Sequence, residues 1–193
     1  MKAVVRIGSL LIISICACSC VESPSTAGSP RLIPDIDSLM DIGASARVSI
    51  NKESVLNGER SSGSYPATAA FGEELSVFSA IETMNRPVFR DAYRKLSRPD
   101  DSSNLSVTEW LAMDSSATVR SFRLFRHDSL PGVMKMEAHL RDDGYFFTKE
   151  EQLMVAFDPW SGRPEHFHVI GRQRIAWMNA DTYEVKATIL YKP

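Results

Sequence analysis

Apolar and polar residues alternate along much of the C-terminal half of the chain. The period is two residues in three segments, 134–140, 153–157 and 183–191. Because successive side chains of a strand point to opposite faces, this period predicts strands that each bury one face. A further strand is expected from Phe167 to Trp177, and another around Phe122 and Leu124. Turn residues separate the segments, and short turns favour antiparallel neighbours.

A longer spacing precedes these segments. Apolar residues recur at three-residue steps, one face of a helix, at Leu75, Phe78, Ile81 and Met84. Pro87 suits the first turn of a second helix, whose apolar stripe continues to Leu96. Residues 106–109 have the Ser-x-x-Glu pattern of a capping box, which predicts a third, short helix containing Trp110.

The two periods together predict an α+β domain. Two or three N-terminal helices would pack on one face of a curved antiparallel sheet of about five strands. This plan resembles cystatin-like or cone-like folds in outline. A small β-barrel is the alternative. Folds of either kind host unrelated functions, so function has to be argued from particular residues.

The N-terminus has the pattern of an export signal. Lys2 and Arg6 precede the apolar run 7–15, and small residues follow. The run Ile15-Cys16-Ala17-Cys18 resembles the lipobox of bacterial lipoproteins. The resemblance implies a signal peptide over residues 1–17, cleavage before Cys18 and acylation of its thiol. Cys20 is the alternative, with Ser19 before it but only Ala17 at the aliphatic position.

The segment behind the signal has linker composition at first. Residues 21–30 are rich in Ser, Pro and Gly, and residues 57–66 are again loop-like. We therefore expect a lipidated N-terminus and flexible tether over residues 18–67 and a single domain over 68–193. All three cysteines lie at or before residue 20, so the domain is expected to contain no disulfide.

Charge limits the classes of partner. The net charge is −2, both cationic residues of the first twenty belong to the signal, and the remainder is mildly acidic. This is not the electrostatic pattern of a nucleic-acid-binding protein. The expected partners are the membrane, through the lipid anchor, and an envelope protein. The lipoprotein resemblance implies location in the bacterial envelope, at the outer rather than the inner membrane if the host is Gram-negative, because no aspartate follows the acylated cysteine.

Few residues stand out as candidate chemistry. His166 and His168 lie two apart and point the same way, so they could share a ligand or metal, with His139 as a third group. The alternation places Phe167 and Val169 in the core, which leaves both histidines facing solvent. Trp160, in a turn, is a candidate partner contact. No catalytic residue, resident metal or cofactor is indicated.

These observations favour a lipid-anchored envelope protein that acts as a non-enzymatic binding or interaction module. One alternative is a carrier of a small apolar ligand in a pocket between sheet and helices, lined by Met134, Met136 and Phe167. Another is a hydrolase that uses His and Asp or Glu, so enzymatic activity is left open as the less favoured reading.

Overall fold

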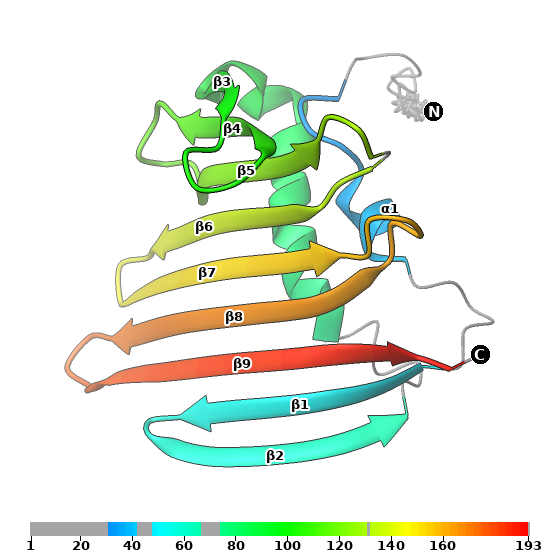
Figure 1. Cartoon of the computed structure of the whole chain (residues 1–193). Coiled ribbons are helices and arrows are strands. Elements are labelled where there is room, and N and C mark those ends of the chain that lie inside the picture. Colours follow the sequence, from blue (N-terminus) through cyan, green and yellow to red (C-terminus); the bar gives the residue numbers. More distant parts are fainter. Residues whose placement is uncertain (1–30, 42–47, 67–73, 131, 193) are drawn as a thin grey trace, which may run out of the picture. The chain divides into compact units, whose positions relative to one another are not determined.

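One antiparallel sheet dominates the protein. The computed structural model describes residues 31–41, 48–66, 74–130 and 132–192. Nine strands pair in the order β2-β1-β9-β8-β7-β6-β5-β4-β3 (Figure 1). Their bounds are β1 Val48–Leu56, β2 Glu59–Pro66, β3 Tyr93–Pro99, β4 Leu105–Ala112, β5 Val119–His127, β6 Lys135–Asp143, β7 Phe147–Phe157, β8 Pro164–Ile175 and β9 Ala180–Tyr191.

The expected fold class is wrong. The sheet has nine strands and not about five, and the only α-helix of the described residues is the five-residue α1, Ile36–Met40. The two expected helices around residues 73–96 are present as 3-10 helices, η1 Ser76–Asn85 and η2 Pro87–Ala92. The barrel alternative also fails, because β2 and β3 lie at opposite ends of the strand order and the described sheet is open.

The four additional strands, β1 to β4, come from segments that the sequence pattern assigned to the tether or to helices. Residues 48–66, expected within the tether, form the hairpin β1–β2, and β1 pairs with the C-terminal strand β9. The capping-box segment at 106–109 lies inside β4, which pairs with β3 and β5. Here Val107 and Trp110 are both buried, on opposite faces of a strand, so packing on both faces outweighs the local helix signal.

The core lies between the sheet and the short helices. η1 crosses the back of the sheet (Figure 1) and buries Phe78, Ile81 and Met84, the stripe that the sequence spacing predicts. Phe78 packs edge-to-face on Phe167 of β8, with ring centroids 6.1 Å apart. Each fully buried side chain of this size contributes about 1.5–3 kcal/mol of hydrophobic stabilisation.

Among the described residues, no helix has the length and apolar character needed to cross a bilayer.

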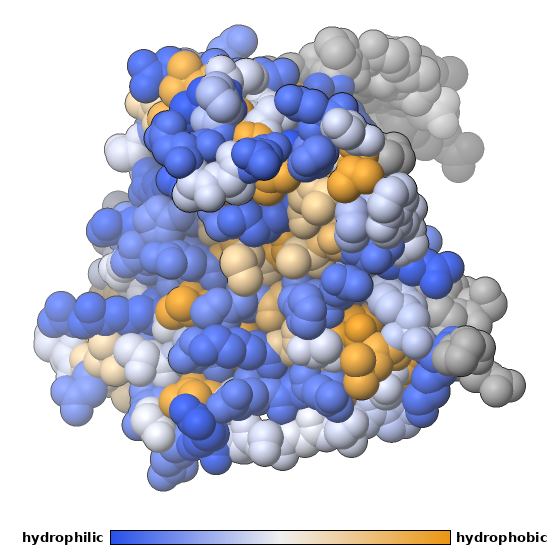
Figure 2. All heavy atoms as spheres, in the orientation of Figure 1, coloured by the Kyte–Doolittle hydropathy of each residue, from blue (hydrophilic) through white to orange (hydrophobic). Residues whose placement is uncertain are grey.

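The opposite face of the sheet, which we call the outer face, is largely polar (Figure 2). A row of charged residues runs across its strands: Glu109 of β4 pairs with Arg123 of β5, and Arg123 with Glu137 of β6. Glu109 is buried and accepts a 2.8 Å hydrogen bond from Arg123 Nε. The outer face thus carries most of the charged groups, although Glu109, Val107 and Phe125 are buried on it over β4 and β5.

Candidate functional site

A group of exposed apolar side chains lies where two neighbouring hairpins end. The β6–β7 connection spans residues 144–146 and the β8–β9 connection spans 176–179. Because β7 pairs with β8, with Phe147 opposite Ile175, both connections lie at the same end of the sheet (Figure 1). We call this group the apolar tip; its members are Tyr145, Phe146, Phe147, Ile175, Trp177 and Met178.

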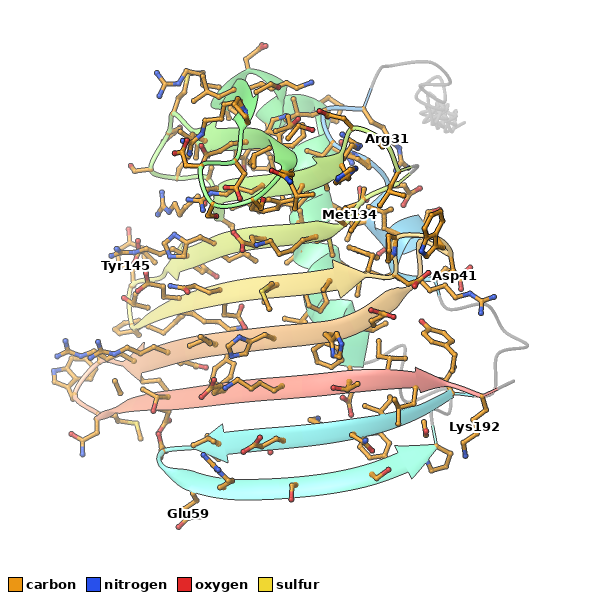
Figure 3. All side chains as sticks on the ribbon, in the orientation of Figure 1. Arg31, Asp41, Glu59, Met134, Tyr145 and Lys192 are labelled. Carbon is orange, nitrogen blue, oxygen red and sulfur yellow. The ribbon has the colours of Figure 1, made fainter. Side chains whose placement is uncertain are left out.

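Direct contacts join the two connections into one surface. The backbone N–H of Ala176 donates a 2.7 Å hydrogen bond to the carbonyl of Phe146. The rings of Phe146 and Trp177 lie with centroids 6.2 Å apart and planes tilted by 40°. Tyr145 is fully exposed at the end of its hairpin (Figure 3). The two connections thus form one exposed apolar surface, joined by the Ala176–Phe146 hydrogen bond and the Phe146–Trp177 ring contact.

Trp177 occupies an unfavourable backbone position. It is the third residue of a turn in which the Met178 N–H donates to the Ile175 carbonyl at 3.0 Å. Its φ is 65°, a left-handed conformation that glycine or asparagine adopts at lower cost. The side chain is also 91% exposed. The turn therefore holds a large aromatic residue in water, in a conformation that does not suit it.

Charged groups border the apolar tip on its strands. Arg141 pairs with Asp143, and Lys149 with Glu151. Arg172 and Arg174 alternate with inward-facing positions of β8, are exposed, and form no ion pair with the described residues. Two cationic groups next to the apolar tip are thus available to an outside partner.

The three candidate histidines all lie on the outer face, away from the apolar tip's connections. His168 Nε2 is 2.8 Å from Glu184 Oε1, and His139 Nε2 is 2.8 Å from Glu150 Oε1. His166 Nδ1 is 3.1 Å from the hydroxyl of Thr188. The buried Phe167 and Val169 face the other way, as the alternation predicts.

Side-chain hydrogen bonds from Lys186 and then from His168 lower the pKa of Glu184. Each of the three candidate histidines is therefore within hydrogen-bond distance of a side chain on a neighbouring strand. Within the described residues, no three His, Cys, Asp or Glu side chains gather in a way that could hold a metal ion.

Shallow depressions on the outer face bring some of these groups together. One of about 640 Å³ is lined by His166 and His168, and one of about 390 Å³ by His139 and His168. Ser121 lies directly opposite His139 in the sheet register. In the described part of the chain no hydrogen bond joins the two, and His139 pairs with Glu150.

Trp160 is exposed but stands apart from the apolar tip. It lies in the β7–β8 connection, at the other end of β7. Asp158 Oδ1 accepts hydrogen bonds from the N–H groups of Trp160 and Ser161, and the Ser161 bond is the main cause of the lowered pKa of this carboxyl group. The contact role expected for Trp160 stays a prediction. Cys18 and Cys20 lie outside the described residues.

The apolar tip was not singled out by sequence reasoning. Its signal is the density of large apolar residues in two turn segments, Gly-Tyr-Phe-Phe at 144–147 and Ile-Ala-Trp-Met at 175–178. The sequence pattern alone assigned Trp177 to the end of a strand. Pairing of β7 with β8 brings the two segments together, and that pairing is not visible in either segment.

Comparisons with known proteins assign no family. No family model matches the chain, and no curated protein matches it. One solved structure, a LolA superfamily protein from Nitrosomonas europaea, is similar over 82% of this chain and 90% of its own, at 12% identity and a TM-score of 0.31. At this score and identity the similarity does not establish membership of that superfamily.

Proposed function

We propose that this chain is a non-enzymatic binding module of the bacterial envelope and that the apolar tip is its contact surface. The observation that carries the proposal is the joined aromatic surface at the ends of β6–β7 and β8–β9. Contiguous exposed apolar surface of this kind is typical of interaction sites. A large apolar side chain left in water forgoes about 1.5–3 kcal/mol of stabilisation. A partner that covers the apolar tip would recover part of that energy.

The N-terminal pattern supports the location. A positively charged start, an apolar run and the Ile15–Cys18 segment favour export and acylation of Cys18, with Cys20 as the alternative. We place the protein at the outer membrane, held by its acyl chains, because neither residue that could follow the acylated cysteine is aspartate. Two or three chains are needed for stable anchoring, since one binds only marginally.

Site-specific photocrosslinking tests the contact surface. Benzoylphenylalanine placed at Tyr145 is irradiated in intact cells, with the same residue at Trp160 as the matched control. Both positions are exposed turn residues, but they lie at opposite ends of β7. We expect adducts, with lipid or protein, from position 145 in clear excess over position 160. Equal yields at both positions, or no adducts at 145, would contradict the proposal.

A carrier of a small apolar ligand is the second candidate, and η1 is the observation that favours it. Ten residues is long for a 3-10 helix, whose hydrogen bonds are poorer than those of an α-helix. Met136 and Phe167, expected to line a pocket, are buried in the same core cluster as the η1 residues, and Phe167 packs on Phe78 of η1. A ligand would therefore have to displace η1 from the sheet. Saturable binding of a fluorescent fatty acid, weakened by Phe78→Trp, would support this candidate, and an unsaturable response would contradict it.

A further inference from the structure

We infer that the partner of the apolar tip is a lipid bilayer, into whose interfacial region the two hairpin ends insert. The inference rests on the proposed function, since it names the partner of the same surface. It is carried by the residue types of the apolar tip, by the backbone conformation at Trp177 and by the two arginines behind it.

The residue types match the membrane interface. Trp and Tyr are enriched at the level of the lipid headgroups, where the ring is apolar and the N–H or O–H group stays hydrated. The apolar tip combines Trp177 and Tyr145 with the purely apolar rings of Phe146 and Phe147. Tyr145, Phe146 and Trp177 lie on connections of three and four residues, and Phe147 is the first residue of β7. Such a projecting edge suits insertion between lipids better than it suits a flat protein surface.

The backbone conformation at Trp177 supports a contact role for this side chain. Glycine or asparagine would relieve the left-handed φ of 65°, and a polar side chain would be better solvated at a position that is 91% exposed. Residues held in sparsely populated conformations cluster at functional sites. The indole is exposed beside the ring of Phe146, and it is the side chain that an interfacial anchor requires.

The charges fit phosphate groups beside the inserted rings. Arg172 and Arg174 project from β8 on the outer face, just behind the apolar tip, without an ion-pair partner among the described residues. Guanidinium groups bind phosphate oxygens through paired N–H donors. Acidic groups nearby are already engaged in part: Arg141 and Arg120 pair with Asp143, and Asn57 donates to Asp181. Asp142 is also exposed at this end.

Because charges of both signs border the apolar tip, apolar insertion should dominate over electrostatic attraction. Binding to a surface of opposite charge weakens as salt screens it, whereas burial of apolar rings does not. Insertion should therefore occur in zwitterionic as well as anionic vesicles and should persist at high salt. This separates the inference from simple attraction of a cationic patch to acidic lipid.

Tryptophan quenching by brominated lipid measures the insertion directly. The full mature protein is reconstituted in vesicles of phosphatidylethanolamine and phosphatidylglycerol. In Trp160→Phe the exposed reporter is Trp177, and in the matched variant Trp177→Phe it is Trp160; Trp110 is buried in both. We expect severalfold stronger quenching and a blue-shifted emission in Trp160→Phe. Both variants carry the same lipid anchor, so a difference between them reports on the apolar tip alone. Equal quenching of the two variants would overturn the inference.

A second pair of variants separates insertion from a folding defect. Phe146→Ser, added to Trp160→Phe, removes the ring that contacts Trp177 and should reduce quenching severalfold, with unchanged circular dichroism. The double change Arg172→Gln with Arg174→Gln should reduce the quenching of Trp177 by a smaller factor than Phe146→Ser does. Unchanged quenching in Phe146→Ser would also contradict the inference. Protein adducts at position 145 without quenching of Trp177 would reject the bilayer and keep the binding module, whereas loss of both signals would reject both.

Discussion

The hydroxyl group of Tyr183 donates a hydrogen bond to the buried carboxylate of Glu151, and the tyrosine ring lies across Gly171 to reach it. The three residues sit side by side on β9, β8 and β7. A Cβ atom added at Gly171 would lie 2.0 Å from Tyr183 Cζ. Burial, and then the bond to Glu151, raise the pKa of Tyr183, so the phenol stays protonated as the donor.

Gly171→Ala should therefore destabilise the protein. The new methyl group would overpack the site and push the Tyr183 ring away from Glu151. This displacement would weaken the hydrogen bond between Tyr183 and Glu151. We expect a loss of about 1–3 kcal/mol in the free energy of unfolding. Urea denaturation followed by circular dichroism measures it. Gly63→Ala on strand β2 is the matched control, because an added Cβ there would meet nothing within 4 Å. An equal loss of unfolding free energy in Gly63→Ala would refute the steric explanation.

Trp177→Asn should stabilise the fold while it reduces binding. Asparagine tolerates the left-handed region, so relief of strain is expected to recover up to about 1 kcal/mol. The same change removes the central ring of the apolar tip. Thermal unfolding and the yield of adducts from benzoylphenylalanine at position 145 are the two measurements. Trp160→Asn, at a position without positive φ, should change neither, and a stabilisation of equal size there would argue against relief of strain.

Alkaline pH should destabilise the protein through Tyr93. Burial raises the pKa of its phenol from the ordinary value of 10.0 to about 12, although the positive charge of Arg120 acts to lower it. The folded state therefore favours the protonated form. Its contribution is fully present below pH 10 and is lost as pH rises through about 12. Tyr93→Phe should flatten the fall in unfolding free energy over this window, measured by urea titration at successive pH values. The exposed Tyr145→Phe should leave the fall unchanged.

Cys18→Ala should abolish acylation. If the thiol of Cys18 receives the lipid, this variant loses palmitate label and separates from membranes, whereas Cys20→Ala keeps both. Metabolic labelling followed by membrane fractionation distinguishes the two. The opposite result, with loss only in Cys20→Ala, would move the cleavage site by two residues. Retention of label in both single variants would reject a unique lipidated cysteine.

Sequence periodicity predicted the strands that bury one face and missed those whose role depends on distant partners. Segments 134–140, 153–157 and 183–191 were predicted correctly as strands, because a period of two leaves no good helical face. β3 was not predicted, because its first residues continue the helical spacing of apolar residues that ends at Leu96. β2 is exposed along nearly its whole length, so its Ser-rich sequence carries no burial pattern. It is a strand only because β1 provides its hydrogen-bonding partner.

The same division applies to the candidate site. The amino-acid order alone determined the absence of cysteine after residue 20 and the alternation that turns His166 and His168 away from the core, and it is the sole basis of the expected export signal. Tertiary structure decided the number of strands, the absence of a third helix near residue 106, and the neighbours of Tyr145 and Trp177. The physical reason is that strand pairing exchanges hydrogen bonds between segments far apart in the chain. Local periodicity records which side of a segment is buried, but it does not record which other segment lies beside it.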